Sequence, residues 1–407
     1  MKPERHQDDV VIVSACRTAF GKFGGVLRNT PALDLAAEVI QGVIRRSGRE
    51  DVSVDEVIVG CCAQCEVKAM APVAARQASL RAGLPDEVVS ITVERACCSS
   101  LAAVQIGQRN IQTGNADVVL VAGMENMSRV PYLVRELRWG TRVGNVALKD
   151  DLFEMESAPG YGAVSVDAGE VALEYGFSRE DQDRWAYESQ MRYQAALKDG
   201  KFEEEIIPIT IPQARGAPVV FEHDEFPKPQ TTVEGLAKLP TIYGSPTVTA
   251  GNAPGLDAGA AALLLMRRSR AEAYGLKSLA RVLTVQSAAG DPHYMAAVPA
   301  KAIQRALACT RLSVDDLSLI EINEAFAAMP MVSLKILADR DEQKTRKLFE
   351  ITNVNGGAIA IGHPVGASGA RVLLTLMFEL RRRGGGFGAA SLCGGLAQGD
   401  AAIIQAE

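Results

Sequence analysis

The chain has 407 residues, of which 47% are hydrophobic and 23% are charged, and its formal net charge is −6. This length exceeds what a single ordinary core accommodates, so two or three domains are expected. The weakly acidic balance disfavours nucleic acid or an anionic membrane as the main partner, and no apolar run approaches the roughly 20 residues of a membrane helix.

The N-terminus and the cysteines indicate a reducing compartment. Residues 1–9 are polar and charged, without the apolar core of a signal peptide or the Arg/Ser bias of a transit peptide. Eight cysteines in so long a chain do not resemble a disulfide framework. We therefore expect reduced thiols and a cytoplasmic location.

The first part of the chain alternates between strand and helix patterns. Pro31 opens a helix whose apolar residues, from Leu33 to Ile44, recur at the spacing of one helical face. Strands are predicted at 10–14, 56–60, 89–93 and 116–123, helices at 31–44, 75–82 and 99–113, and an irregular loop at 61–70. Such alternation predicts an α/β sheet covered by helices on both faces.

The α/β rhythm breaks after Met127 and resumes near Val248. The stretch between, residues 129–247, is richer in charge, Pro, Trp and Tyr, and is predicted to contain a helix pair around 178–200. An alanine-rich helix and strand are then predicted up to Met266. We interpret the middle stretch as an insertion into the first half.

The last part of the chain repeats the order of the first. Strands are predicted at 280–286, 319–322 and 386–394, and helices at 299–309 and 372–383. In each half a special residue, Cys97 or His363, opens a helix that is followed by a strand with a glycine end. We interpret this order as an internal duplication that brings equivalent helix starts together near a pseudo-two-fold axis.

Three reactive side chains are predicted to meet in one acyl-transfer site. Cys97 lies where a strand runs into a helix, and a helix N-terminus lowers a thiol pKa. His363, within the glycine-rich stretch 356–371, could act as its general base, and the glycines after Cys393 could offer backbone N–H groups to an oxyanion. Taken singly, each also fits a bland alternative: a core thiol, a histidine bonded to loop backbone, or strand-end packing.

Other motifs are weaker. Asn323 follows a strand and could orient a water or a carbonyl, or equally cap a helix. Cys62 and Cys65 have the spacing of half a zinc site, but a second pair is absent, so no metal is predicted. A phosphate loop is rejected because His363 and Pro364 stand where Lys and Ser/Thr are required.

Together these stretches resemble the thiolase family of acetyl-CoA acyltransferases over nearly the whole chain. The matching residues are 11–15 with Arg17 and Thr18, Cys97 with Ser99 and Leu101, 123–128, 247–253, 323–326, 355–358, 362–364 with 368–369, and Cys393 with Gly395. The resemblance implies a duplicated five-layer αβαβα fold with an inserted loop domain. Its parts would be residues 1–128 and 248–277 for the first half, 129–247 for the insertion and 278–407 for the second half.

The resemblance also implies roles for the reactive residues. Cys97 would carry the acyl group as a thioester, His363 would activate it, and Cys393 would move the proton at the α-carbon. One oxyanion hole would be His363 with a water held by Asn323, and the other the backbone N–H groups of Cys97 and Gly395. Coenzyme A would be a substrate, without a permanently bound cofactor, and the assembly would be a homodimer or a dimer of dimers.

The residues expected to bind substrate or CoA are Val164, Ala250, Asn252, Ala253 and Phe326. Departures from the family pattern gather near this pocket. They are Glu94 for Asn, Ser100 for Gly, residues 163–165 without the expected His-Met, Pro254 for Ser, residues 396–397 for glycines, and a longer loop at 61–70.

These departures predict a bulky or aromatic 3-oxoacyl-CoA, such as the benzoylsuccinyl-CoA of one family member, which would imply a small zinc-finger/OB-type partner subunit. The alternatives are an ordinary acetyl-CoA acetyltransferase or 3-ketoacyl-CoA thiolase, and a non-catalytic acyl-CoA-binding subunit. A ketoacyl synthase and an HMG-CoA-synthase-like enzyme are disfavoured by Asn323 and Cys393.

Overall fold

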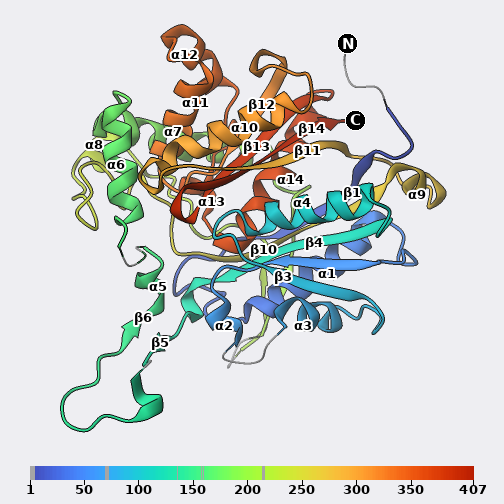
Figure 1. The fold of residues 1–407 in the computed structure, drawn as a ribbon, viewed down its shortest axis with the longest axis horizontal. Helices are drawn as coiled ribbons and strands as arrows, with labels where there is room; N and C mark the ends of the chain where they lie inside the picture. The colour runs from blue at the N-terminus through green and yellow to red at the C-terminus, as the bar shows by residue number, and fades with distance from the viewer. Residues whose placement is uncertain (1–4, 69–72, 135, 157, 159, 213–215) are drawn as a thin grey trace.

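One large mixed sheet organises the molecule (Figure 1). The computed structural model describes residues 5–68, 73–134, 136–156, 158, 160–212 and 216–407. Within them, ten strands form a sheet of order β12-β13-β14-β11-β1-β10-β4-β2-β3, with β7 paired to β1 off this path. The two halves of the sheet meet where the start of β1 pairs antiparallel with the start of β11.

The two halves share one order of four strands, to which the first half adds β3. The first comprises β1 (Val10–Thr18), β2 (Glu56–Gly60), β3 (Val89–Val93), β4 (Val118–Asn126) and β10 (Ala258–Arg267). The second comprises β11 (Ala280–Ala289), β12 (Leu317–Ile322), β13 (Gly386–Gly394) and β14 (Gln398–Ala406). The order β2-β4-β10-β1 with one parallel and two antiparallel pairings recurs as β12-β13-β14-β11. This recurrence is the predicted duplication.

Helices make the remaining layers. On the outer face of the first half lie α1 (Ala32–Ser47) and α3 (Ala74–Arg81), and on that of the second lie α10 (Val298–Ala308) and α11 (Ala328–Leu337). Between the two halves, α4 (Ser99–Gln112) packs on α14 (Ser368–Arg382). Both central helices bury apolar side chains in one core with strands of both halves. The five-layer αβαβα fold predicted from the sequence is therefore confirmed.

The remaining elements, which are short except for the helices α6 and α7, lie mostly in the insertion. They are α2 (Gln64–Lys68), η1 (Met127–Arg129), β5 (Tyr132–Leu133), η2 (Glu136–Trp139), β6 (Lys149–Asp150), α5 (Asp151–Glu154), α6 (Val164–Glu174), α7 (Arg179–Lys198), β7 (Ile206–Ile207), β8 (Ile209–Ile211), β9 (Val219–Phe221), α8 (Val233–Ala237), α9 (Arg268–Ala273), η3 (Pro292–Ala297), η4 (Val314–Asp316), α12 (Glu342–Glu350), α13 (Ala358–Ile361), η5 (Val365–Ala367) and η6 (Gly395–Ala397). Figure 1 shows β5 and β6 on an arm that extends away from the body.

Three sequence predictions about elements are wrong. Residues 178–200 form one helix, α7, because Ser178 and Asp181 make a capping box and nothing interrupts the helix before Lys198. The alanine-rich helix before Met266 is absent, since residues 258–267 are strand β10. The loop at 61–70 contains the short helix α2, and its positions 69 and 70 lie outside the described residues.

In the part of the chain that the structure describes, no helix has the length and apolar character needed to cross a bilayer.

Candidate active site

Cys97 lies in a tight turn between β3 and α4. Ala96 has the left-handed φ of 45°, and Cys98 is the N-cap of α4. The Arg95 N–H donates to Ser99 Oγ over 2.9 Å, and Ser99 Oγ donates to the Ala96 carbonyl oxygen over 2.6 Å. These two bonds fix the backbone of the turn and thereby the position of Cys97, which remains partly exposed.

His363 is held on both sides of its ring and at its backbone. Its N–H donates to Asp257 Oδ2 over 2.7 Å, directly after Gly362 with a φ of 113°. Nδ1 lies 2.6 Å from Ser368 Oγ, and this hydroxyl donates its proton to the Pro364 carbonyl oxygen over 3.0 Å. Ser368 must therefore accept from Nδ1–H, which leaves Nε2 as the unprotonated nitrogen.

The unprotonated nitrogen of His363 faces the thiol. His363 Nε2 lies 3.2 Å from Cys97 Sγ, although 266 positions separate the two residues in the chain. With the tautomer set by Ser368, the thiol is the donor and the imidazole the acceptor. This arrangement suits removal of the thiol proton by a general base.

Asn323 completes the ring of contacts around Nε2. Its Nδ2 lies 3.4 Å from His363 Nε2, and its Oδ1 accepts a bond from an Arg371 terminal nitrogen over 3.3 Å. The alternative interpretation of Asn323 as a helix cap is wrong, because the next helix, α11, begins at Ala328.

Cys393 is fully buried near the end of β13, and the turn that follows it packs against the Cys97 turn. A methyl group placed on Gly394 would lie 3.1 Å from the Arg95 carbonyl oxygen, and one on Gly395 would lie 3.4 Å from Ala96 Cβ. The glycines thus let the two turns approach closely. Cys393 is near enough to Cys97 for its charge to disfavour a second thiolate there.

The electrostatics correct one prediction. Burial, followed by the neighbouring Cys393, raises the pKa of the Cys97 thiol above its ordinary value, so the expected lowering by the start of α4 is wrong. Desolvation of the charged form outweighs the helix dipole here. Burial, and then the positive charge of Arg371, lowers the pKa of His363 to about 3, so the resting pair is neutral. Burial raises the pKa of Cys393 to about 12.

Three of the five predicted substrate-binding residues share one apolar cluster with Cys393. These are Val164, Ala253 and Phe326. Val164 begins α6 in the inserted segment, so that segment closes one side of the cluster.

The other two predicted substrate-binding residues lie in the turn before β10. Ala250 is exposed there. Asn252 is fully buried and holds the turn: its Oδ1 accepts from the Thr249 N–H, and its Nδ2 donates to Asp183 and to the Thr247 carbonyl. This side chain is committed to protein partners.

Two departures from the family pattern, Ser100 and Glu94, make local hydrogen bonds. Ser100 is buried and its hydroxyl accepts from the Ala370 N–H over 2.9 Å, which ties α4 to α14. Glu94 accepts from the Ala96 N–H over 2.7 Å, within the turn that carries Cys97. Leu396 and Ala397 both keep left-handed backbones, with φ of 54° and 52°, where glycine is usual. None of these contacts indicates a bulky acyl group, and nothing in the structure explains Pro254.

Asp257, Ser368 and Arg371 are the residues around His363 to which the sequence prediction gives no role. The match at residues 368–369 contains Ser368, but its effect on the tautomer depends on a turn that only the folded chain forms. Arg371 acts on His363 through its charge, from a buried position on α14. No local pattern distinguishes these residues from ordinary core polar groups.

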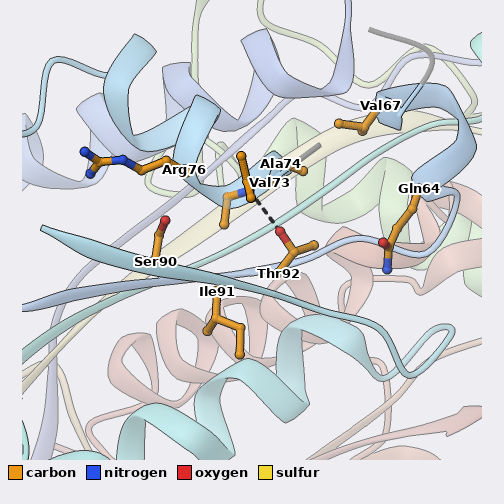
Figure 2. Close-up of a pocket in the computed structure, with 9 residues that line it drawn as sticks. Gln64, Val67, Val73, Ala74, Arg76, Ser90, Ile91 and Thr92 are labelled. Atoms are coloured by element: carbon orange, nitrogen blue, oxygen red, sulfur yellow. Dashed lines mark hydrogen bonds between the residues drawn. The ribbon is translucent and has the colours of Figure 1, made fainter. Parts of the chain in front are cut away.

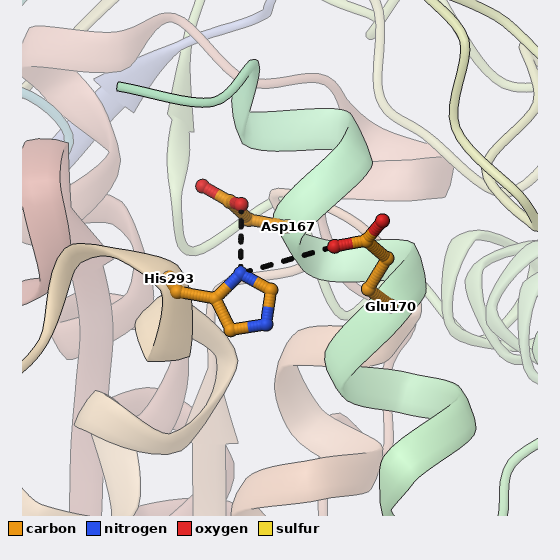
Figure 3. Close-up of side chains that lie close together, drawn as sticks. All are labelled: Asp167, Glu170 and His293. Carbon is orange, nitrogen blue, oxygen red and sulfur yellow. Dashed lines mark hydrogen bonds and ion pairs between the residues drawn. The ribbon is translucent and has the colours of Figure 1, made fainter. Parts of the chain in front are cut away.

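One described group of side chains could share a metal ion: Asp167 and Glu170 on α6, with His293 on η3 (Figure 3). His293 Nδ1 lies 2.9 Å from Asp167 Oδ1, and its Nε2 lies 3.6 Å from Glu174 Oε1. The hydrogen bond with Asp167 is the main cause that raises the pKa of His293, so the three side chains are held together by contacts with one another. The absence of a metal stays a prediction.

A cavity of about 260 Å³ lies between α3 and β3 (Figure 2). It is lined by Gln64, Val67, Ser90, Ile91, Thr92 and residues 73–76. None of these residues belongs to the site around Cys97, so the cavity gives no information about the acyl group.

Comparisons with known proteins agree with this geometry. The family model "Thiolase, N-terminal domain" matches residues 10–269, and "Thiolase, C-terminal domain" matches residues 276–406. The chain is 44% identical to an acetyl-CoA acetyltransferase of Pseudomonas aeruginosa, over 97% of this chain and 99% of that protein. It is 43% identical to an acetyl-CoA acetyltransferase of Escherichia coli K12, over 97% and 98% of the two chains.

Two solved structures are similar over nearly the full length. The Bacillus anthracis acetyl-CoA acetyltransferase has a TM-score of 0.92 at 39% identity and covers 98% of this chain and 99% of its own. The human mitochondrial 3-ketoacyl-CoA thiolase in complex with CoA has a TM-score of 0.92 at 37% identity and covers 98% of each chain.

Proposed function

Because the chain belongs to the thiolase family of acyltransferases, we propose that it cleaves a short 3-oxoacyl-CoA with coenzyme A, or runs the reverse condensation of two acyl-CoA molecules. The observation that carries this proposal is the 3.2 Å contact between Cys97 Sγ and His363 Nε2. A decayed, non-catalytic acyl-CoA-binding subunit would have no need of a thiol paired with a correctly oriented base.

In the proposed reaction, His363 Nε2 removes the Cys97 proton as the sulfur attacks the 3-oxo carbon. The bond between carbons 2 and 3 then breaks, leaving the acyl group on Cys97, and the departing acetyl-CoA carbanion takes a proton from Cys393. The thiol of CoA next gives its proton to Cys393 and attacks the thioester, and Cys97 leaves and recovers its proton from His363. The Cys393 pKa of about 12 suits a group that must exchange protons with a weak carbon acid.

Two donor pairs would hold the oxygen charge in these steps. The first is His363 N–H, once protonated, with a water bound to Asn323. The second is the pair of backbone N–H groups of Cys97 and Gly395, which belong to two turns that pack against each other. The apolar cluster with Val164, Ala253 and Phe326 would hold the acyl chain.

The acyl group is proposed to be acetoacetyl or another short chain rather than a bulky or aromatic one. The relatives at 44% and 43% identity are named acetyl-CoA acetyltransferases, which favours the ordinary alternative over the benzoylsuccinyl interpretation. We assign residues 1–128 with 248–277, 129–247 and 278–407 to the first half, the insertion and the second half.

The test is a panel of 3-oxoacyl-CoA esters, from acetoacetyl-CoA to long-chain and aromatic members, with mass spectrometry of the protein after each. Acetoacetyl-CoA is expected to react fastest and to leave an acyl group on Cys97. Faster turnover of an aromatic ester, or a requirement for a co-expressed small subunit, would restore the benzoylsuccinyl interpretation. Binding of CoA esters without an adduct on Cys97 would identify a non-catalytic subunit.

A further inference from the structure

Arg371 is buried without the partner that a buried guanidinium usually has. It lies on α14 with no solvent exposure, and the Glu321 carboxylate stands 3.7 Å from its NH1 atom. Within the described chain, its Nε and NH1 atoms have no hydrogen-bond partner. Burying a charge costs several kcal/mol unless pairing is close, so this loose ion pair does not account for the residue.

The hydrogen bond that Arg371 does make leads into the active site. Its NH2 atom donates to Asn323 Oδ1 over 3.3 Å, and Asn323 Nδ2 then lies 3.4 Å from His363 Nε2. The backbone of Asn323 is fixed independently, because its N–H donates to the Ser391 carbonyl over 3.0 Å. The hydrogen bond from Arg371 therefore fixes the one remaining freedom of Asn323, the rotation of its side-chain amide.

The two orientations of this amide differ in chemistry. With Oδ1 toward Arg371, the Asn323 N–H groups face His363, and a water that accepts from them keeps both its protons for a substrate oxygen. In the flipped orientation, Oδ1 would face the site and bind one of those protons, while two donors would meet at the guanidinium. Because a guanidinium has only donors, Arg371 favours the amide orientation that turns Oδ1 toward it and disfavours the flipped one.

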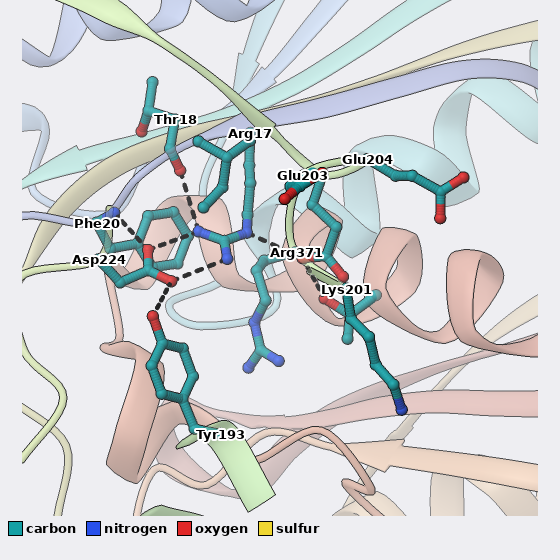
Figure 4. Close-up of polar contacts among 12 residues, drawn as sticks. Arg17, Thr18, Phe20, Tyr193, Lys201, Glu203, Glu204, Asp224 and Arg371 are labelled. Atoms are coloured by element: carbon teal, nitrogen blue, oxygen red, sulfur yellow. Dashed lines mark hydrogen bonds and ion pairs between the residues drawn. The ribbon is translucent and has the colours of Figure 1, made fainter. Parts of the chain in front are cut away.

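We propose that Arg371 is a positioning residue that acts through Asn323, holding its amide so that only hydrogen-bond donors face the reacting carbonyl oxygen. The inference rests on the proposed thiolase reaction. In Figure 4, Arg371 lies beside the Arg17–Asp224 network and interacts with it through charge, while its NH2 atom donates to Asn323.

The experiment is a double-mutant cycle on thiolysis, with Arg371→Lys, Asn323→Ala and the double variant. Lysine keeps the positive charge but lacks the planar guanidinium that bonds to Asn323. R371K is therefore expected to lower kcat about 10- to 100-fold, which is comparable to the loss of one oxyanion donor, and to keep KM within about threefold of wild type. If Arg371 acts through Asn323, the double variant is expected to be no slower than N323A within about threefold.

The matched control is Arg382→Lys, on the same helix, whose side chain pairs with Glu379 and Glu204. R382K is expected to keep the wild-type kcat. A wild-type kcat in R371K, or losses that multiply in the double variant, would overturn the inference. Loss of the acyl adduct on Cys97 in the wild-type protein would instead overturn the proposed function.

A second variant covers the case in which R371K folds poorly. In Asn323→Asp a carboxylate still accepts from Arg371 but presents no N–H to His363. It is expected to lose as much kcat as N323A while keeping its thermal midpoint closer to wild type. A wild-type kcat in N323D would show that no donor is needed there and would end the proposal.

Discussion

At the scale of single residues, Cys97 faces a general base without being a thiolate at rest, although these two properties of a cysteine are often found together. Cys97 is oriented toward a base but is not stored as a thiolate, because burial raises its pKa and lowers that of His363. The resting state is a neutral thiol hydrogen-bonded to a neutral imidazole. The nucleophile would be formed only when substrate provides an acceptor for the developing charge.

Alkylation of Cys97 by iodoacetamide tests this charge state. Since the folded thiol pKa is raised, the thiolate fraction grows with pH throughout the accessible range. The rate at Cys97, followed by mass spectrometry of the peptide, is expected to rise about one log unit per pH unit from about pH 6 to 9. Exposed Cys309 on the same chain is an internal reference. A rate that is already constant near pH 5 would indicate a thiolate–imidazolium pair and contradict the expectation.

The sequence predicts those features of the site that depend on neighbouring residues, and it misses those that depend on residues distant in the chain. Local residue types make Cys97, His363 and Cys393 candidates, the resemblance to the thiolase family selects them over the bland alternatives, and the structure brings Cys97 and His363 into contact. The sign of the Cys97 pKa shift could not be predicted, because a helix start is visible in the sequence whereas desolvation by distant segments is not. The tautomer of His363 depends on Ser368 in the same way.

At the scale of elements, the turn η6 after Cys393 has a left-handed backbone at two residues, Leu396 and Ala397, that are not glycine. Leu396 is 41% exposed and adopts the left-handed conformation, which costs an L-residue roughly 1–2 kcal/mol relative to glycine. The turn is retained because β13 and β14 pair on both sides of it. The strain is local and can be relieved by one substitution.

Leu396→Gly is therefore expected to raise the free energy of unfolding by about 1 kcal/mol, since glycine adopts a positive φ without steric cost. The matched control is Leu197→Gly, which replaces a similarly exposed leucine in the last turn of α7 and is expected to lower stability by up to about 1 kcal/mol. Urea denaturation of the two variants measures both changes. Equal destabilisation by the two substitutions would show that the turn stores no strain.

The elements that the sequence predicts wrongly are those in which local preference and tertiary environment disagree. Residues 258–267 are rich in alanine and leucine, which favour helices, yet they form β10 at the centre of the sheet with nine of its ten residues buried. Burial between α1 on one side and the central helices on the other decides the outcome. By contrast, the helical character of residues 178–200 is predicted from the sequence, although as a pair of helices and not as the single helix α7.

At the scale of the whole molecule, a buried ionic network joins the insertion to the first half of the sheet (Figure 4). Arg17 at the end of β1 pairs with Glu205 over 3.0 Å and with Asp224 over 2.7 Å, and all three side chains are inaccessible to solvent or nearly so. Tyr193 of α7 donates to Asp224 Oδ2 over 3.3 Å. The network lies directly beside the β1–β7 pairing.

Arg17→Met is expected to lower the free energy of unfolding by about 3–5 kcal/mol, because two buried carboxylates would lose their partner. The control is Arg49→Met, which removes an exposed pair with Asp51 and is expected to leave stability nearly unchanged. The urea midpoints of the two variants give the comparison. A similar small effect from both would mean that Glu205 and Asp224 become protonated or solvated without cost.

One edge of the large sheet is formed by an apolar strand, β3, that could mediate assembly of the protein. Strand β3 ends the ten-stranded sheet, and Val89 and Ile91 on it are 63% and 46% exposed. An unpaired apolar edge favours association with another chain unless something covers it. The expected homodimer would cover this edge by placing two copies of β3 together.

Ile91→Lys is expected to convert the dimer to a monomer at micromolar concentration, since the charge would be buried in the interface. Light scattering coupled to size exclusion measures the mass. Leu197→Lys, a similarly exposed leucine on α7, is the control and is expected to leave the dimer intact. A monomeric wild-type chain, or a dimeric I91K, would move the interface elsewhere. Because the lining of the small cavity includes Ile91, a dimer of this kind would also close that cavity from solvent.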